Sequence, residues 1–315
     1  MTSTTACAEI IAIGTELTCG SKLDTNSQWL SRELESLGWT VMRHTTLADD
    51  LDLIIEELQA AAERSQAVLI TGGLGPTLDD LTREAMAAAF HQPLVRDAES
   101  LQRIEAMFAA RGRPMPARNV VQADRPEQAT AIRNDWGTAP GILLQVPATA
   151  ENSGCLLAAM PGVPAEMRPM FEHLVRPHLL DSGIQMCRRV IRTFGYGESE
   201  AERLLDGLTA RGRNPEVGIT ASEAVISLWI TARATTEETA RQMCEETEQQ
   251  IRQRLGVAVF GDGDIELHDV TARLLHQQHK TVALLEGTTT GGQLAMWLTE
   301  TPDSDAVLHE ALVLP

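Results

Sequence analysis

The chain has 315 residues, of which 43% are hydrophobic, so it is long enough for two domains with packed cores and a further partial unit. Its formal charge of −18 argues against broad attraction to nucleic acid or to anionic membranes. No apolar run approaches the roughly 18 residues of a membrane span, and residues 1–5 lack the basic and apolar segments of a signal peptide. The five cysteines are scattered and odd in number, which is typical of reduced thiols in a cytoplasmic protein.

Strands and helices alternate over the first eighty residues. Apolar runs predict buried strands at 8–13, 40–42 and 68–70. Helical spacing of apolar residues predicts helices at 25–37, from about 50 and from about 81. This alternation favours a doubly wound, mostly parallel α/β sheet, in which ligands bind beyond the carboxyl ends of the strands.

A glycine-rich loop follows the third predicted strand. It reads Thr71-Gly72-Gly73-Leu74-Gly75-Pro76-Thr77-Leu78-Asp79-Asp80-Leu81-Thr82. Glycines at a strand-to-helix turn let the backbone come close to a ligand and aim free N–H groups at an anion. Carboxylates just beyond the turn can hold a divalent cation, or a water, against a phosphate. The loop therefore predicts nucleotide or phosphate chemistry.

The acidic residues near this loop each allow two interpretations. One of Asp79 and Asp80 can cap the following helix, which would leave the other for a metal ion or a water. Helix capping is also expected of either Asp49 or Asp50, although a carboxylate at that strand end could join the site. Glu16 is either a ligand or a surface charge.

Three further loops in the same region have a similar character. Residues 111–119 contain three arginines, for which a solvated turn is favoured over a phosphate clamp. Gly137–Gly141 precedes a predicted strand, and Met160–Pro164 follows another predicted strand and opens a helix. Together with the glycine-rich loop, the Gly/Pro loops predict a ligand site rather than a set of ordinary turns.

The pattern changes near residue 181. Strands and helices of a small α+β module are predicted at 189–194, 198–208, 225–232 and 236–255. A third segment begins near residue 265 with a helix, a strand and a second helix, and it is too short to bury a core on its own. We therefore expect domains at 1–180, 181–262 and 263–315.

These motifs resemble those of the CinA-like family, the competence/damage-inducible CinA proteins. The first domain is similar to the molybdopterin-binding fold of molybdenum-cofactor enzymes. The similar stretches cover most of residues 8–175 and comprise 9–17, 24–26, 71–82, 137–141 and 160–167. The Gly-Gly-Leu-Gly-Pro-Thr-x-Asp-Asp-Leu-Thr string is the most specific of them.

The resemblance implies a hydrolase that cleaves the pyrophosphate of ADP-ribose or a related nucleotide. A divalent cation (cobalt, manganese or magnesium) is implied, and potassium is linked to the activity. By position, Asp80 matches the aspartate of the relatives' loop and is assigned to metal or phosphate activation, with Asp79 beside it at the metal and Asp49 as a further catalytic carboxylate. The expected substrate-binding residues are Gly14, Thr15, Glu16, Asn26, Thr71, Gly72, Gly73, Gly75, Pro76, Thr77, Thr82, Gly137, Thr138, Ala139, Gly141, Pro161, Gly162, Val163, Pro164 and Glu166.

The middle module resembles the KH-like domain of the same family. The similarity rests on Phe194–Ser199 and Val259–Gly261. Residues 187–260 lack a GxxG loop and carry ten arginines against eleven acidic residues, which argues against RNA binding. We expect a packing or dimerisation module, and hence a homodimer that binds a small-molecule nucleotide but neither nucleic acid nor membrane.

The last segment resembles the beginning of the family's nicotinamide-mononucleotide deamidase domain. That domain carries Glu-Ser-Cys-Thr-Gly-Gly with the serine as nucleophile, whereas this chain has Glu286-Gly287-Thr288-Thr289-Thr290-Gly291-Gly292. Aligned on the last three residues, Thr288 stands at the serine position and Gly287 at the glutamate position. The segment covers about a third of the usual domain, so we expect it to be truncated and without deamidase activity.

Three hypotheses for the function follow. The leading one is a metal-dependent nucleotide pyrophosphatase. The second is pterin binding or adenylyl transfer, which the shared fold suggests, although fold alone is a poor guide to function. The third is a regulatory or scaffold protein that binds a pterin or a nucleotide without catalysis.

Overall fold

The computed structural model describes residues 6–148, 154–179, 183–222 and 224–314. These form two compact units, Met1–Ile184 and Gln185–Pro315. The predicted domain boundary at residues 180 and 181 lies outside the described residues. Within the described part of the chain, no helix is long and apolar enough to cross a membrane.

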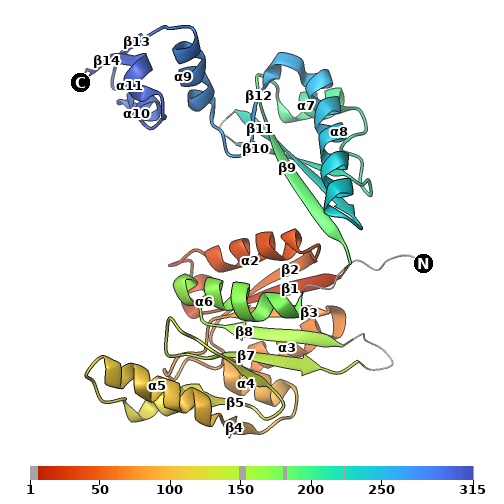
Figure 1. The fold of residues 1–315 in the computed structure, drawn as a ribbon, viewed down its shortest axis with the longest axis vertical. Helices are drawn as coiled ribbons and strands as arrows, with labels where there is room; N and C mark the ends of the chain where they lie inside the picture. Colours follow the sequence, from red (N-terminus) through yellow and green to blue (C-terminus); the bar gives the residue numbers. More distant parts are fainter. Residues whose placement is uncertain (1–5, 149–153, 180–182, 223, 315) are drawn as a thin grey trace. The chain divides into compact units, whose positions relative to one another are not determined.

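The first unit is built around a six-stranded sheet with the strand order β2-β1-β3-β8-β7-β6 (Figure 1). The first four strands in this order run parallel, whereas β7 and β6 are antiparallel to their neighbours. The strands are β1 (Cys7–Ile13), β2 (Thr40–Leu47), β3 (Ala67–Thr71), β6 (Thr130–Ile132), β7 (Gly141–Val146) and β8 (Cys155–Met160). The mostly parallel α/β sheet predicted from the alternation of elements is therefore confirmed.

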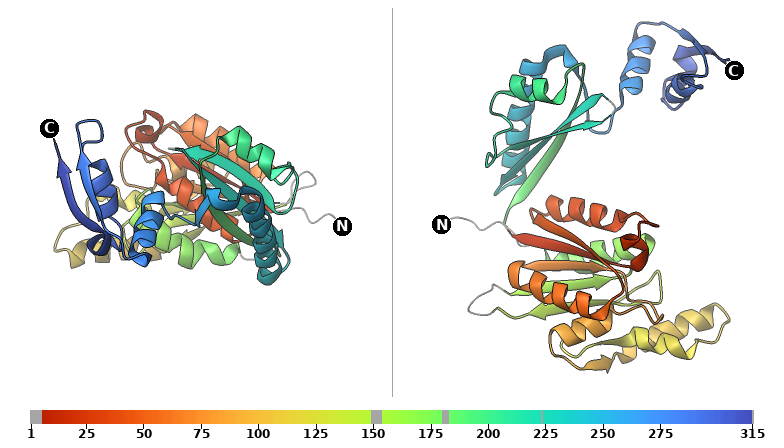
Figure 2. Two further views of the ribbon diagram at one scale, coloured as in Figure 1. Left: turned by 90° about the horizontal axis from the view of Figure 1, so that it is seen from above. Right: turned by 180° about the vertical axis from the view of Figure 1, so that it is seen from behind.

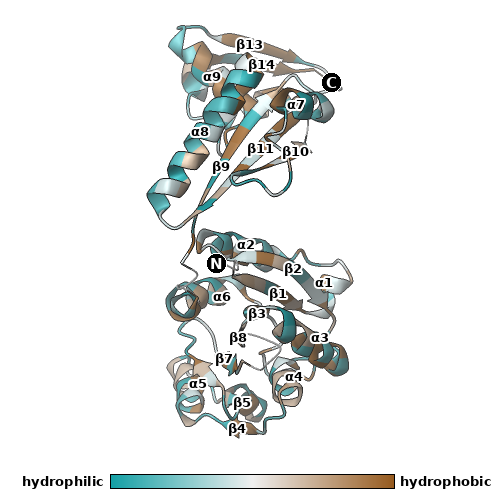
Figure 3. Ribbon diagram, turned by 90° about the vertical axis from the view of Figure 1, so that its right-hand side faces the viewer, coloured by the Kyte–Doolittle hydropathy of each residue, from teal (hydrophilic) through white to brown (hydrophobic). Residues whose placement is uncertain are grey.

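Helices cover both faces of this sheet, as Figures 1 and 2 show from opposite sides. One face carries α2 (Thr25–Ser36) and α6 (Pro164–Met170), and the other carries α3 (Leu51–Arg64) and α4 (Thr82–Ala89). Because strands buried on both faces expose no side chain to water, their sequences are continuous apolar runs. Strand β1 is such a run apart from Glu9 and is drawn mostly in brown in Figure 3.

The core lies on both sides of the sheet. Successive residues of β1 serve opposite faces, since Ile10 packs with the α2 residue Leu30 whereas Ile11 packs with the α3 residues Ile54 and Leu58. All of these side chains are fully buried. The two layers hold the strands in register, so that the loops at their carboxyl ends start from fixed positions.

A smaller substructure of the first unit was not predicted from the sequence. It consists of helix α5 (Ala98–Ala110) and a two-stranded antiparallel ribbon of β4 (Leu94–Arg96) and β5 (Asp124–Pro126). Strands of three residues carry too few residues to show a period, so no pattern marks them. Shorter helical turns of this unit are α1 (Thr15–Thr18) and the turns at 117–123, 171–175 and 176–178.

The second unit begins with a four-stranded antiparallel sheet in the order β10-β11-β9-β12. Its elements are β9 (Gln185–Phe194), α7 (Glu198–Leu205), β10 (Glu216–Ser222), β11 (Val225–Ala234), α8 (Glu237–Leu255) and β12 (Val259–Asp262). Both helices pack on one face through buried residues such as Leu205 and Ile251. The predicted α+β character is confirmed, while β10, which carries a glycine within the strand, and β12, which has four residues, were missed.

The rest of the second unit has a small core. Its elements are α9 (Leu267–Gln277), β13 (Val282–Glu286), α10 (Gln293–Thr299), α11 (Ser304–Val307) and β14 (Leu308–Val313). Strands β13 and β14 pair in parallel. The buried apolar residues of this core are Ala272, Leu298 and Val307.

Candidate functional site

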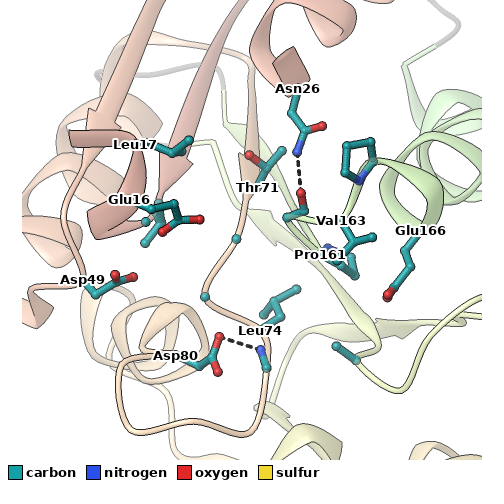
Figure 4. A pocket seen from close by; sticks show the side chains of 18 of the residues that line it. Glu16, Leu17, Asn26, Asp49, Thr71, Leu74, Asp80, Pro161, Val163 and Glu166 are labelled. Atoms are coloured by element: carbon teal, nitrogen blue, oxygen red, sulfur yellow. Dashed lines mark hydrogen bonds between the residues drawn. The ribbon is translucent and has the colours of Figure 1, made fainter. Parts of the chain in front are cut away.

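The carboxyl ends of β1, β3 and β8 meet at one edge of the first sheet, and a pocket of about 380 Å³ lies there (Figure 4). Its walls are the loops that follow these strands, together with the start of α2. The predicted site residues that line it are Gly14, Glu16, Asn26, Asp49, Thr71, Gly72, Gly73, Gly75, Pro76, Asp79, Asp80, Thr138, Ala139, Pro161, Gly162, Val163, Pro164 and Glu166. The structure therefore brings residues from five separate loops to one place, namely those after β1, β2, β3 and β8 and the one before β7.

Five predicted residues do not line the pocket but surround it. Thr15, Thr77 and Thr82 donate hydrogen bonds that hold site loops. Gly137 lines a neighbouring pocket, and Gly141 is the first residue of β7. Sequence reasoning missed other lining residues, namely Ile13, Leu17, Lys22, Leu23, Asp24, Thr25, Leu74 and Gln122. Most of these are chain neighbours of recognised motifs, so only Gln122 lacked a nearby signal.

The glycines of the central loop allow a close approach of three backbone segments. Gly72 has φ = +99°, a region that L side chains rarely adopt, and a Cβ there would collide with the Ile13 carbonyl. The Gly72 N–H donates to the Met160 carbonyl at 3.0 Å. A Cβ at Gly162 would in turn meet the Gly72 Cα at 3.4 Å. The loops after β1, β3 and β8 therefore pack backbone against backbone beneath the pocket.

Asp80 holds the glycine-rich loop rather than capping the following helix. Its Oδ1 accepts from the Gly75 N–H at 2.8 Å (Figure 4). Its Oδ2 accepts from the Thr77 N–H at 2.8 Å and from the Thr77 hydroxyl. Helix α4 begins after Leu81 with no side-chain cap. The interpretation of Asp79 or Asp80 as a helix cap is therefore wrong, because the loop turns back and offers its own N–H groups to the Asp80 carboxylate.

Arg83 supports the same loop from the buried side. Its Nη1 donates to the Leu74 carbonyl at 2.7 Å and its Nη2 to the Gly75 carbonyl at 2.8 Å. The side chain is fully buried, and burial lowers the pKa of its guanidinium below the ordinary value. Within the described residues no carboxylate lies at ion-pair distance from it. Arg83 thus holds the loop by hydrogen bonds to its carbonyls, and Asp80 holds it by hydrogen bonds from its N–H groups.

Asp79 is the exposed member of the acidic pair. The nearby Thr77 side chain is the main influence that lowers the pKa of Asp79 below its ordinary value, and the Asp79 backbone N–H and the Arg118 charge lower it further. Arg118 itself donates from Nε to the Pro76 carbonyl. Of the three arginines at 111–119, Arg118 therefore contacts the glycine-rich loop, which the interpretation of this segment as a solvated turn did not anticipate.

Asp49 and Asp50 have separate roles. Asp50 caps α3, since its Oδ1 accepts from the N–H groups of Asp52 and Leu53 at 3.1 Å each. Asp49 lines the pocket, and its Oδ2 accepts from the Thr15 N–H at 2.7 Å and the Thr15 hydroxyl at 2.8 Å. Capping by Asp50 thus leaves Asp49 to join the loop after β2 to the loop after β1.

Asn134 organises the opposite wall, although no sequence motif marked it. Its Nδ2 donates to the Ala139 carbonyl at 2.8 Å and to Glu166 Oε2 at 2.7 Å, and its Oδ1 accepts from the Gly137 N–H at 2.9 Å. Asn134 is buried. It therefore fixes both the loop at 137–141 and the pocket-lining carboxylate Glu166.

Asn26 connects α2 to the loop that follows β8. Its Nδ2 donates to the Gly162 carbonyl at 2.9 Å, as Figure 4 shows. The first turn of α2 is set by Asp24, whose Oδ1 accepts from the Ser27 N–H at 2.9 Å. A capped helix start thus places Asn26 at the pocket.

Carboxylates dominate the charge of the pocket. The acidic lining residues are Glu16, Asp24, Asp49, Asp79, Asp80 and Glu166, and the cationic one is Lys22. Lys22 Nζ lies 4.0 Å from Glu16 Oε1. An anionic ligand in such a pocket requires backbone N–H donors and a cation to offset the carboxylates.

The described residues include no cluster of three or more His, Cys, Asp or Glu side chains that could hold a metal ion. Hard oxygen donors nevertheless suit magnesium or manganese, which proteins often hold with one or two carboxylates plus phosphate oxygens of the substrate. Asp79 and Asp80 fit this donor chemistry as adjacent carboxylates at the pocket.

The remaining predicted motif lies in the second unit. Thr288 belongs to the turn between β13 and α10. Next to this turn, the buried Glu286 carboxylate accepts from the N–H groups of Leu294 at 3.1 Å and Ala295 at 2.8 Å. Glu286 therefore supports the start of α10.

Comparison with known proteins places both units in context. A family described as probable molybdopterin binding domain matches residues 9–181, and one described as damage-inducible protein CinA KH domain matches residues 188–261. A CinA-like protein of Dictyoglomus thermophilum is 42% identical over 97% of this chain and 73% of its own length. A putative competence-damage inducible protein of Clostridium beijerinckii is 36% identical over the same shares.

Solved structures similar to this chain include CinA from Thermoplasma acidophilum, a protein of unknown function. It is 31% identical, covers 55% of this chain and 98% of its own, and has a TM-score of 0.49. The family matches and the full-length relatives extend over both units. The chain belongs to the CinA-like family, with a molybdopterin-binding-like domain followed by a KH-like domain.

Proposed function

We propose that the first unit is a metal-dependent hydrolase of the pyrophosphate bond in ADP-ribose or a related nucleotide. The observation that supports this most is the convergence of glycine turns and carboxylates at one sheet edge. Backbone N–H groups at such turns suit a phosphate, and carboxylates beside them suit a divalent cation. A pocket of about 380 Å³ is within the usual range for small-molecule sites.

The proposed reaction is attack of water on one phosphorus of the pyrophosphate. The bond from that phosphorus to the bridging oxygen breaks, and ADP-ribose yields AMP and ribose 5-phosphate. Asp79 and Asp80 would hold the divalent cation, which supplies Lewis-acid polarisation of a phosphoryl oxygen when bound. N–H groups of the glycine-rich loop stabilise the charge that develops on the attacked phosphoryl group.

Asp49 is our candidate for the group that accepts a proton from the attacking water. Its Oδ2 is held by Thr15, and within the described residues no donor lies on its Oδ1. A carboxylate fixed through one oxygen presents the other in a defined direction. Asn26 and Glu166 would position the nucleoside part of the substrate from the far wall.

The test is incubation with ADP-ribose and cobalt, manganese or magnesium, with and without potassium. We expect AMP and ribose 5-phosphate in equal amounts, complete loss of turnover with EDTA, and at least a hundredfold loss in Asp80→Ala. Glu63→Ala, at an exposed position of α3, is the matched control and should retain wild-type turnover. Absence of AMP with every metal would overturn the proposal.

A second candidate is a nucleotide- or pterin-binding regulator without catalysis. It is favoured by the bonds of Asp80 to its own loop, which give that carboxylate a structural role. Binding of AMP without turnover of ADP-ribose would support this candidate.

We also propose that the second unit lacks deamidase activity. Release of ammonia when the protein is incubated with nicotinamide mononucleotide would contradict this proposal.

A further inference from the structure

Two backbone N–H groups of the glycine-rich loop already donate hydrogen bonds within the protein. The N–H groups of Gly75 and Thr77 both point at the Asp80 carboxylate, at 2.8 Å each. Nearby N–H groups that point at one anionic group, here at the two oxygens of a carboxylate, form the type of concave site that binds phosphate. In this structure the carboxylate of the chain itself occupies that concavity.

The Asp80 carboxylate packs closely against Gly75. A Cβ at Gly75 would collide with Asp80 Oδ2 in its present position, so the glycine lets the carboxylate approach the loop this closely. Asp80 and Gly75 both line the pocket, so a ligand there can contact the Gly75 N–H, and the Thr77 N–H, just behind the lining, points at the same carboxylate. A phosphate group carries the same kind of anionic oxygen acceptors as the carboxylate.

Arg83 keeps the loop in this conformation from behind. Its two hydrogen bonds to the Leu74 and Gly75 carbonyls fix the peptide planes on either side of Gly75. Since the Leu74 carbonyl and the Gly75 N–H belong to the same planar peptide unit, holding that carbonyl restricts the direction of the N–H. A buried guanidinium without a carboxylate partner is costly, which argues for a role beyond packing.

We propose that in the free protein the Asp80 carboxylate occupies the position that the ligand's phosphate takes in the complex. Arg83 is the positioning residue, which keeps the Gly75 and Thr77 N–H groups directed at this position when phosphate replaces the carboxylate. The inference rests on the proposed function, because it assigns phosphate to this pocket. When phosphate takes the two N–H donors, Asp80 leaves the loop and becomes available to a cation. No covalent step is involved.

The first experiment measures binding of inorganic pyrophosphate and AMP by calorimetry in EDTA, so that neither turnover nor metal contributes. Asp80→Ala should bind pyrophosphate about tenfold more tightly than Asp79→Ala, although both variants remove one negative charge. Asp80→Asn should lie between them, since its amide oxygen still accepts one N–H. Equal affinities of Asp80→Ala and Asp79→Ala, or weaker binding by Asp80→Ala, would overturn the proposal.

The second experiment follows the backbone amides of Gly75 and Thr77 by NMR. In Asp80→Ala both resonances should move upfield from wild type and return downfield on addition of pyrophosphate. Adding Arg83→Lys to Asp80→Ala should abolish at least three quarters of the gain in affinity, with retained thermal unfolding as the check on folding. Unchanged amide resonances in Asp80→Ala would contradict the exchange even if the protein hydrolyses ADP-ribose, whereas a protein without turnover that shows these shifts would contradict only the proposed function.

Discussion

Lys22 stands out in the pocket because of its charge. The chain contains two lysines, Lys22 and Lys280, and Lys22 lies among six lining carboxylates. Its ammonium is 4.0 Å from Glu16 and its side chain is 57% exposed, so it can turn from Glu16 toward a bound anion without a large desolvation cost. A flexible, exposed ammonium of this kind acts on a phosphate mainly through its charge.

We expect Lys22→Ala to weaken AMP binding about three- to tenfold, measured by calorimetry at low ionic strength. The difference from wild type should shrink at about 0.5 M salt, because exposed charges are screened there. Lys280→Ala, which removes the other lysine from the second unit, is the control and should bind AMP like wild type. A loss that is independent of salt would contradict a role through charge.

The residue-scale roles in this site differ in how far the sequence can predict them. Glycines and carboxylates at strand ends are visible as a pattern, so the pocket itself was predictable. Asp79 and Asp80 are identical side chains in adjacent positions, and only the path of the loop assigns one to the Gly75 N–H. Arg83 and Asn134 left no signal, because an arginine in a helix and an asparagine before a turn are ordinary in sequence.

At the scale of elements, an ion pair between the buried Glu9 and the partly exposed Arg64 joins β1 to α3. Arg64 donates from Nε and Nη2 to the two Glu9 oxygens at 2.8 and 2.7 Å, and the Ser65 hydroxyl adds a bond at 2.7 Å. Glu9 is only 1% exposed. Burial by itself would raise the pKa of Glu9, but the hydrogen bonds from Arg64 and Ser65 outweigh burial, and the pKa lies below its ordinary value.

This lowered pKa gives the stability a defined pH dependence. The contribution of Glu9 is complete at neutral pH, above the ordinary carboxyl pKa of 4.5, and is lost as the pH falls through that value toward the lowered pKa of the folded state. We expect Glu9→Gln to lose about 3 kcal/mol of unfolding free energy at pH 7, and the loss to shrink below pH 4.5. Urea unfolding at pH 7, 5 and 3.5 measures this.

The control for Glu9→Gln is Glu63→Gln, which changes an exposed glutamate of α3. It should alter the unfolding free energy by less than about 0.5 kcal/mol at every pH. If the two variants lose the same unfolding free energy, or if the Glu9→Gln loss grows on acidification, the Glu9–Arg64 ion pair does not stabilise the fold as proposed.

Elements with a clear local pattern were predictable from sequence, and those without one were not. Helix α3 and strand β3 carry a clear period or a continuous apolar run, and both appear where they were predicted. Strand β2 is longer than its apolar part, because parallel pairing with β1 extends it through polar residues to Leu47. Strands β10 and β12 exist only through their pairing with β11 and β9, which no local pattern records.

The distribution of buried side chains is uneven over the whole molecule. The sheet of the first unit is packed on both faces, with fully buried residues such as Ile10, Ile11 and Leu69. The sheet of the second unit is packed through residues such as Ile191 and Leu228. By contrast, the core of residues 267–313 has Ala272, Leu298 and Val307 as its buried apolar side chains. Buried apolar area is the main favourable term in folding, so this last segment has the least to stabilise it.

We therefore expect backbone amide exchange to be graded along the chain. Amides of β1 and β3 should exchange slowest, those of β9 and β11 next, and those of β13 at least a hundredfold faster than β3 because local opening there exposes little apolar surface. Hydrogen–deuterium exchange with mass spectrometry at pH 7 measures all of these strands in one sample. Strand β14, which pairs with β13, is the internal control and should exchange at a similar rate. Protection of β13 equal to that of β3 would mean that residues 267–313 are stabilised by contacts other than their own core.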